Sequence, residues 1–474
     1  TTFKNRSTPA PSTRSMACKA QTSGRIYLHS GPRTELHEII RQEYARHQDR
    51  AVPRNTLRQA VQGMLDTFAY QNFDAAAGEY TNRCCRPPRE TEMRPWRLVT
   101  EIGWTGGGVL AYPLVLCRDA LGADAEAPLA AAMSGEQLFD RIADAYNENS
   151  GLLNDLMAPN AAGSQVNGWW TGYGLVKDCH CAYTVGSAVH YLTKTMDYLH
   201  QNGKPCPAKW MDAAQKVLHT VMDLQRADGA FGYTYSTQER KVLDWSGFAG
   251  CWFAPALVYL YRLTGEERCL HSAEKALHYY HTFVKDLNCY GTPMDTWKAV
   301  DEEGNLAFMR GSRLLYEQTG KAEFLQYMKD SAGYEFLWRY GYKTYPEHTP
   351  LNQGWSACGG AVTSVSNPHI HPMGVIIDTD LRYLARVTGD GYYASRAADS
   401  AAWMLQCLEL YPAATGYGRY GILSERWCPS DGLDVERFSD GRPFSSWFSH
   451  NLWASACVLE AACELLLEIE RKKG

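Results

Sequence analysis

Three acidic residues lie in long, aromatic-rich segments of the chain, a setting suited to bond-cleaving chemistry: Asp244, Glu425 and Asp295. Glycoside hydrolysis commonly uses two carboxyl groups, one kept protonated by an apolar setting and one ionised as base or nucleophile. Asp244 directly precedes an apolar run and lies beside Trp245, so we expect its pKa to be raised, as in a general acid. These three residues are therefore the candidate catalytic groups.

Each of these acids also has a structural interpretation. Asp244 can cap the helix that follows it, a role that Asp commonly fills. Glu425, in the segment SERW, can form an ion pair with Arg437 or Arg442 that fixes its loop. Asp295, in the segment TPMDTWK, can be a turn residue that follows a proline. The sequence leaves these alternatives open.

Aromatic side chains gather in the same segments. The C–H faces of sugar rings stack on such side chains, while the sugar hydroxyls bond to carboxylates and amides. We expect roughly half of the aromatic residues to be structural, because Trp is largely buried in most proteins. Asn and His residues of these segments are equally interpreted as ligand-facing groups or as loop anchors. The candidate substrate-binding residues are Trp104, Asn167, Trp170, His180, Trp245, Trp297, Trp355, His369, His371, Arg426, Trp427, Arg437, Trp447 and His450.

Two short motifs invite a metal interpretation, Cys179-His180-Cys181 and the His369-x-His371 pair. Neither has a second pair of ligands at a zinc-binding spacing, so we expect no metal and no cofactor. The 15 cysteines form an odd, scattered set, often within apolar stretches. Buried free thiols explain this pattern, which predicts a reducing compartment and a cytoplasmic location.

The element that positions these residues is a buried helix followed by a half-buried one. Residues 247–261 carry no charge and are apolar on all sides, which predicts a helix buried all round. This helix ends at Thr264-Gly265, and an amphipathic segment follows at once. The unit recurs, so that six amphipathic segments alternate with six apolar ones. The sequence therefore predicts an all-α ring of twelve helices.

The connections of this ring are unequal in length. The step from an apolar helix to the next amphipathic one takes only a few residues, whereas the return step is long, over 71–104, 150–180, 227–246, 287–300, 341–371 and 411–445. Long loops in a compact domain are usually functional. All six would emerge on one face, around the N-termini of the inner helices, whose free N–H groups favour anions and oxygen-rich ligands.

Length and charge agree with one large soluble domain. The chain has 474 residues, and we expect residues 1–54 to form an extension with one extra helix and 55–474 to form the ring. A net charge of −5 without a basic cluster argues against nucleic acid as a partner. The longest apolar run is too short to span a bilayer, which needs about 20 residues. A neighbouring subunit can close such a pocket, so a homo-oligomer stays an alternative.

In its helix pattern and short motifs, the chain resembles the (α/α)6-toroid carbohydrate-active enzymes, whose fold is also called a six-hairpin barrel. The resemblance covers about residues 55–470 and rests on the helix alternation with Thr-Gly stops, LQRADGAFGY at 224–233 and DWSG at 244–247. It is most similar to the unsaturated glucuronyl hydrolases and related exo-acting β-glucuronidases. The resemblance implies an acid/base Asp in a funnel at the mouths of the inner helices, which corresponds here to Asp244.

We therefore expect a glycoside hydrolase that cleaves a terminal sugar, with a uronic acid as one candidate, from an oligosaccharide. A polysaccharide lyase that removes the C5 proton of an acidic sugar, with His371 or Tyr420 as base, is the first alternative. A sugar epimerase or a non-catalytic carbohydrate-binding toroid is the second. The sequence does not decide between retention and inversion, because it does not give the distance between the two carboxylates.

Overall fold

The computed structural model describes residues 36–47, 50–85, 94–97, 101–103, 106–156, 167–171, 174–292, 298–344, 356–365, 367–408, 410, 421, 423–425, 427 and 448–472. The chain divides into two units, Thr1–Leu36 and His37–Gly474. Apart from the first residue of helix α1 (Leu36–Arg46), every element named below belongs to the second unit.

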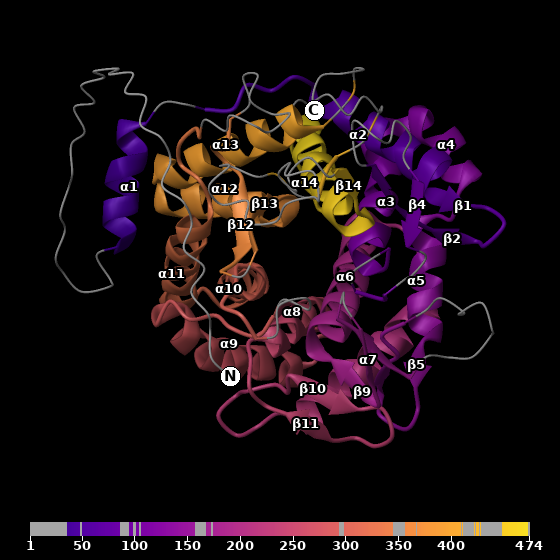
Figure 1. Cartoon of the computed structure of the whole chain (residues 1–474). Coiled ribbons are helices and arrows are strands. Elements are labelled where there is room, and N and C mark those ends of the chain that lie inside the picture. Colours follow the sequence, from indigo (N-terminus) through magenta and orange to yellow (C-terminus); the bar gives the residue numbers. More distant parts are fainter. Residues whose placement is uncertain are drawn as a thin grey trace, which may run out of the picture. The chain divides into compact units, whose positions relative to one another are not determined.

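Six helices form the inner wall of a ring in this unit (Figure 1). They are α3 (Gly108–Leu121), α6 (Ala182–Gln201), α8 (Phe253–Thr264), α10 (Glu303–Thr319), α12 (Asp378–Thr388) and α14 (Leu452–Arg471). Each packs on the next, the short helix η5 (Pro372–Ile377) completes the wall beside α12, and α14 packs on α3 to close the circle.

Six further helices pack outside this wall, each against its inner partner. They are α2 (Leu57–Thr67), α5 (Gly135–Asp144), α7 (Ala208–Asp223), α9 (Glu267–Lys285), α11 (Ala322–Trp338) and α13 (Gly391–Cys407). The helices alternate between outer and inner along the chain, as the hydrophobic pattern predicts. The (α/α)6 toroid is thus confirmed.

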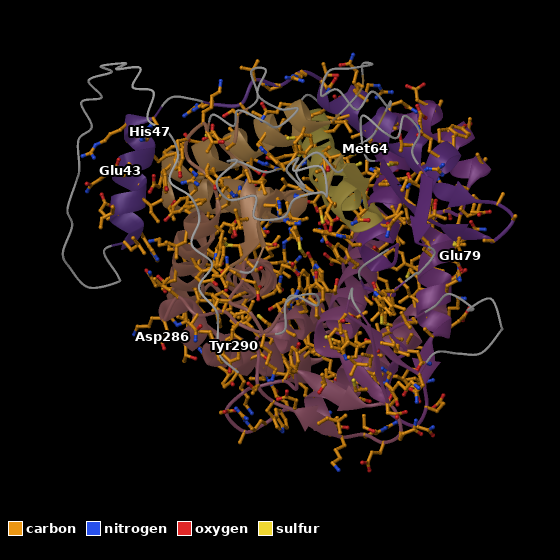
Figure 2. All side chains as sticks on the ribbon, viewed as in Figure 1. Glu43, His47, Met64, Glu79, Asp286 and Tyr290 are labelled. Atoms are coloured by element: carbon orange, nitrogen blue, oxygen red, sulfur yellow. The ribbon has the colours of Figure 1, made fainter. Side chains whose placement is uncertain are left out.

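Side chains fill the space between the two layers (Figure 2). Residues 253–260 of α8 are all buried, as expected of a helix that is apolar on every side. Outer helix α9 buries one stripe, which includes Ala273, Leu277 and Tyr280. Met64 of outer helix α2 is 0% exposed in the same layer. Burial of apolar surface between the two layers therefore drives ring formation.

Three inner helices end at the Thr-Gly pairs recognised in the sequence. In α8 the Thr264 hydroxyl donates to the Leu260 carbonyl at 2.8 Å, which satisfies one of the last carbonyl groups of the helix. Gly265 follows in the left-handed conformation (φ 72°), which a residue with a Cβ adopts at a cost. The same arrangement ends the other two helices, α10 at Thr319-Gly320 and α12 at Thr388-Gly389.

The long connections contain small antiparallel sheets, which the sequence analysis did not predict. The pairs are β1 (Phe73–Asp74) with β2 (Glu79–Tyr80), β5 (Tyr146–Asn147) with β6 (Leu152–Leu153), β7 (Gly168–Trp170) with β8 (Leu175–Lys177), and β12 (Ala361–Ser364) with β13 (Asn367–His371). Two sheets join different connections, namely β9 (Cys179–Cys181), β10 (Thr234–Ser236) and β11 (Val242–Asp244), and β3 (Asn82–Cys85), β4 (Arg94–Arg97) and β14 (Phe448–His450). They tie the connections together at the N-terminal ends of the inner helices.

Among the described residues, no helix combines the length and the apolarity that a membrane span needs. The extra helix α1 precedes the ring, and Arg41 donates to both carboxylate oxygens of Asp390, at 2.7 and 2.9 Å. Asp390 is the N-cap of outer helix α13.

Candidate active site

The mouth of the ring is formed by the first turns of the inner helices. Tyr183 of α6 lies edge-to-face against Trp252, in the short helix η4 (Ala249–Trp252) that precedes α8, with ring centroids 5.9 Å apart. The Tyr183 hydroxyl lies 3.9 Å from the Met373 sulfur of η5. His371, which precedes η5, stacks on Trp453 of α14 at 5.9 Å with 20° between the ring planes. Four of the inner wall's segments thus meet in one aromatic cluster, whose side chains are 1% to 4% exposed.

The fourth inner helix brings a carboxylate to this cluster. Glu303 is the first residue of α10 and is 8% exposed. The pKa of the Tyr183 hydroxyl is raised well above its usual value by burial and by the nearby carboxylate of Glu303. Glu303 therefore faces α6 across the mouth, in a setting from which most water is excluded. A nearly buried acid beside aromatic rings is the arrangement that acid/base chemistry requires.

Asp301, two residues earlier, has a structural role. It is 0% exposed, and its two carboxylate oxygens accept from the Gly304 and Thr292 amides, both at 3.2 Å. It satisfies a free N–H group in the first turn of α10, as an N-terminal acid commonly does. Burial raises the pKa of Asp301 well above its usual range.

Glu302 points in another direction, towards outer helix α11. It is 0% exposed, and burial together with the negative charge of Glu335 raises its pKa well above the usual range. Arg339 donates to Glu335 at 2.8 Å and to Asp378 at 2.8 Å, so one guanidinium serves a group of three carboxyls. Because a buried charge without a partner is costly, we infer that Glu302 carries a proton.

Gly374 shows how closely this acidic group packs against η5. A Cβ at Gly374 would lie 2.2 Å from one carboxyl oxygen of Glu302. Only glycine fits there without moving the acid. The group therefore fixes the start of η5 relative to α10, and with it the positions of Met373 and Glu303 at the mouth.

Asp244 lies at the rim of the mouth, at the end of β11, and its predicted pKa shift is wrong in sign. Lys298 donates to one carboxylate oxygen at 2.6 Å, and the Ser246 amide donates to the other at 2.8 Å. Burial acts to raise the pKa, but these bonds outweigh it and the pKa of Asp244 is lowered. Asp244 also does not cap the next helix, because η4 begins only at Ala249. The carboxyl is therefore ionised, and its catalytic role remains a prediction.

Glu425 reaches the mouth from the last long connection. Its carboxylate accepts from the side-chain amide of Asn451, the N-cap of α14. Two residues further on, Trp427 exchanges two backbone hydrogen bonds with Ile370 of β13, at 2.9 and 3.0 Å. The segment is thus held beside β13, whose last residue is His371. Glu425 and Glu303 therefore lie at the N-termini of two inner helices, α14 and α10, between which η5 and α12 complete the wall.

Three of the predicted substrate-binding residues are internal anchors. His180 is 1% exposed and bonds to Asp155 at 2.7 Å and to Ser150 at 2.9 Å. His450 is 0% exposed, and Trp427, at 1% exposed, donates its indole N–H to the Ser424 carbonyl at 3.0 Å. Their ring nitrogens are used within the protein, so these side chains are not presented to a ligand.

The remaining predicted residues differ in environment. Trp245 is half-buried, with the Arg226 guanidinium 5.1 Å from its ring centroid, and Trp170 is half-buried at the end of β7. Asn167 donates to Asp178 at 2.9 Å at an exposed position, and His369 is buried in β13. The others lie outside the described residues: Asp295, Trp104, Trp297, Trp355, Arg426, Arg437 and Trp447.

No group of three or more His, Cys, Asp and Glu residues within the described ranges is arranged to hold a metal ion. In the Cys179-His180-Cys181 motif, both ring nitrogens of His180 already have protein partners. The described cysteines from Cys117 onward are free thiols, and all of them except Cys206 are buried.

Two residues of the candidate site, Glu303 and Tyr183, were not predicted from the sequence. A signal for Glu303 was available, because three consecutive acids, VDEEGN, directly precede the fourth apolar helix. Three adjacent acids at a helix start point in different directions, so each has a different role. Tyr183 is the second residue of a helix that is almost entirely buried, and its sequence context does not distinguish it from a core residue.

No model of a known protein family matches the chain, and no curated protein is similar to it in sequence. Solved structures share its fold. An alpha-mannanase of glycoside hydrolase family 76 from Bacteroides thetaiotaomicron is 12% identical and has a TM-score of 0.55, over 89% of this chain and 98% of that one. A cellobiose 2-epimerase from Spirochaeta thermophila is 12% identical, with a TM-score of 0.53 over 92% and 99%. A mutant of unsaturated glucuronyl hydrolase from Streptococcus agalactiae is 14% identical, with a TM-score of 0.50 over 90% and 95%. These proteins are (α/α)6-toroid enzymes that act on carbohydrates.

Proposed function

We propose that the protein is a glycoside hydrolase that releases a terminal sugar from an oligosaccharide at the mouth of the ring. The observation that carries the proposal is Glu303, a nearly buried carboxyl beside the Tyr183 hydroxyl, at a mouth where Tyr183 packs on Trp252 and His371 stacks on Trp453. Aromatic rings beside a carboxyl suit a sugar, whose C–H faces stack while its hydroxyls accept and donate hydrogen bonds. The solved structures that share the fold include glycoside hydrolases, which supports the same activity.

In this proposal Glu303 and Glu425 form the pair of carboxyls that glycoside hydrolysis requires. Glu425 is held by an amide donor, which favours the ionised form of a carboxylate and suits a base or nucleophile. Glu303 lies in the more apolar setting and would donate a proton to the leaving oxygen. Asp244, ionised by its bond to Lys298, is assigned to the rim, where it can accept from sugar hydroxyls.

A uronic acid is the first substrate class to test, because the long connections carry Arg94, Arg426 and Arg437. Arg pairs with a planar carboxylate through two parallel hydrogen bonds. The test is to incubate the protein with a panel of aryl glycosides, aryl uronides and unsaturated uronides and to measure the release of the aryl alcohol. If the protein hydrolyses no compound of the panel faster than buffer alone does, the hydrolase proposal is contradicted.

A pair of adjacent variants tests the site itself. Glu303→Gln removes an ionisable proton and is expected to lower kcat/KM roughly 10²- to 10⁴-fold. Glu302→Gln is the matched control, because a neutral amide resembles the protonated acid inferred there, and activity should fall less than roughly tenfold. Equal losses in both variants would mean that the acidic run supports the fold rather than the chemistry.

One observation favours a second candidate, a lyase or epimerase. The His371 ring nitrogen Nδ1 lies 3.1 Å from the His369 carbonyl and donates to it, so Nε2 is the basic nitrogen of the ring. A base at this position can remove a proton from a carbon of a sugar, the first step of both reactions. Ultraviolet absorbance of an unsaturated uronate would identify a lyase, and deuterium uptake from solvent into the sugar an epimerase. Incorporation of ¹⁸O from water at the anomeric carbon would identify a hydrolase.

A further inference from the structure

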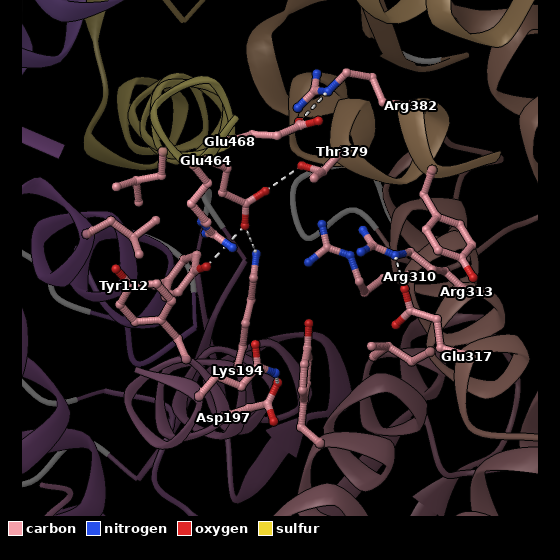
Figure 3. A pocket seen from close by; sticks show the side chains of 18 of the residues that line it. Tyr112, Lys194, Asp197, Arg310, Arg313, Glu317, Thr379, Arg382, Glu464 and Glu468 are labelled. Atoms are coloured by element: carbon pink, nitrogen blue, oxygen red, sulfur yellow. Dashed lines mark hydrogen bonds and ion pairs between the residues drawn. The ribbon is translucent and has the colours of Figure 1, made fainter. Parts of the chain in front are cut away.

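A hollow of the ring lies between the inner helices, mostly among their middle and C-terminal residues. We call it the axial cavity. Its volume is about 400 Å³, and all six inner helices line it, through residues such as Tyr112, Lys194, Tyr259, Arg310, Arg382 and Glu464. Figure 3 shows labelled side chains from α3, α6, α10, α12 and α14 around this cavity. The volume lies within the roughly 300–1,000 Å³ of small-molecule sites.

The lining of the axial cavity is strongly basic. It contains eight Lys and Arg side chains but only four Asp and Glu side chains. The formal net charge of the whole chain is −5, so this concentration of cations is local. A concave, positively charged surface with low-dielectric walls raises the local concentration of anions.

Ion pairs neutralise only part of this charge. Lys194 pairs with Glu460 and Glu464, while Arg310 and Arg313 share Asp380. Arg262, Arg313, Arg382 and Lys472 pair with Glu317, Asp197 and Glu468, so six acids in total contact six of the eight cations. Burial raises the pKa of Glu460, whereas Lys194 and Arg310 outweigh burial at Glu464 and lower its pKa. Eight cations and six contacting acids therefore leave the cavity with a surplus of about two positive charges.

Two of the arginine side chains that carry this positive charge lie at the open space of the axial cavity. Arg386 is exposed at the end of α12 and, within the described ranges, lies over the Tyr383 ring at 5.1 Å rather than beside a carboxylate. Arg313 lies 22% exposed on the wall, with its guanidinium near Tyr383 as well. Planar guanidinium groups on two adjacent helices can both donate pairs of N–H bonds to one tetrahedral anion.

Helix dipoles explain only part of this arrangement. Basic residues are favourable in the last turn of a helix, which accounts for Arg262, Arg386 and Arg471. Lys194 and Arg310 lie within the middle of their helices, beyond the reach of the terminal partial charge. They are 4% and 6% exposed, and Glu460, Glu464 and Asp380 offset the cost of burying them.

We propose that the axial cavity binds a small anion that carries a phosphate group, such as a phosphorylated sugar, a nucleotide or inorganic phosphate. A phosphate dianion matches the surplus of positive charge and the fork of Arg donors better than a single carboxylate does. The hydroxyl groups of Tyr112 and Thr379, which also line the cavity, both donate to Glu464 and hold this carboxylate in place beside Lys194. The site lies at the end of the inner helices away from Glu303, so it is separate from the proposed hydrolase site.

Isothermal titration calorimetry with the intact protein tests this inference. The titrants are inorganic phosphate, pyrophosphate, glucose 6-phosphate, a nucleoside diphosphate and glucuronate, each at low and at high salt. We expect the phosphate compounds to bind more tightly than glucuronate, and binding to weaken as salt rises. The ranking among the phosphate compounds identifies the source of the group. Absence of binding by all of them at millimolar concentration, or equal binding of glucuronate, would overturn the assignment.

Arg313→Ala combined with Arg386→Ala locates the site. After this change Glu317 keeps Arg262 and Asp380 keeps Arg310, so no acid is left without a partner. The double variant should bind phosphate about 10- to 100-fold more weakly, as expected for lost hydrogen bonds between charged groups. Arg268→Ala combined with Lys275→Ala, on outer helix α9, removes the same charge and should bind as the wild type does.

Phosphate affinity unchanged in the double variant would place the anion elsewhere and overturn the proposal. Circular dichroism and the melting temperature establish that the variants are folded, and Arg386→Ala alone, at an exposed position, provides the same comparison if the double variant unfolds. Because the titration needs no turnover, its outcome does not depend on the proposed hydrolase activity. Repeating it with the Glu303→Gln protein should give the same affinity.

Discussion

His450 provides a sharp test of how the mouth is built, because its ring is entirely enclosed. Its nitrogens contact Leu423, Ser455 and Asn72 at 3.0 to 3.1 Å, and Phe68 stacks beside it. The Asn72 side-chain amide nitrogen donates to Thr81, so the Asn72 oxygen accepts from Nε2–H of a neutral His450. Burial lowers the pKa of His450 from 6.5 to about 4.

This shift makes stability depend on pH. Between pH 6.5 and 4 the unfolded chain binds a proton at His450 that the folded protein does not bind. The free energy of unfolding must therefore fall as pH falls through this range. At about 1.36 kcal/mol for each pKa unit, the loss is roughly 3 kcal/mol by pH 4. Above pH 6.5 both states are neutral at this residue, and the contribution to the pH dependence vanishes.

The measurement compares wild type with His450→Gln, whose amide does not titrate. Urea unfolding at several pH values from 7 to 4 gives the difference in unfolding free energy between the two proteins. This difference should shrink by about 3 kcal/mol towards pH 4. Taking the difference removes the contributions of other buried groups, among them His190, whose pKa is also lowered. A difference that stays constant with pH, or an NMR titration of His450 near pH 6.5, would refute the enclosed-anchor interpretation.

Three further predictions concern the ring and its rim. Trp210→Ala should lower the free energy of unfolding by about 3–5 kcal/mol in urea titrations, because this side chain is 0% exposed between α7 and α5. Gly389→Ala should lower the free energy of unfolding by about 1–2 kcal/mol, as expected for left-handed backbone with open space around it. Gly359→Ala should lower it clearly more, because the added Cβ would lie 2.2 Å from a backbone oxygen. Equal losses of stability in thermal unfolding would contradict the packing described. Lys298→Met should raise the pKa of Asp244 in a ¹³C NMR titration, and the roughly 0.5–1 kcal/mol that the pair contributes at neutral pH should disappear in acid.

The fold was predictable because its signals are local. The Thr264-Gly265 pair ends α8 through a side-chain bond to a residue four positions earlier and through a left-handed glycine. Both features depend on adjacent residues, as does the apolar character of α8. The length of the connections then indicated the face of the ring on which the candidate site is proposed.

The environments of the site residues were not predictable, because their partners are distant in sequence. Asp244 has a lowered pKa only because Lys298, from the next long connection, lies against it. His180 is an anchor rather than a ligand because Asp155 and Ser150 reach it from an earlier part of the chain. Periodicity reports which side of a helix is buried, but it does not report which side chains meet across a ring.

The contact that closes the ring has a consequence for synthesis in the cell. Helix α14 packs against α3 and α2, yet it is the last of the twelve ring helices to be translated. At about 5–20 residues per second, the first helices wait tens of seconds before their final partner leaves the ribosome. During that interval the nascent chain exposes the apolar sides of α2 and α3, where a chaperone can bind before the last helix replaces it.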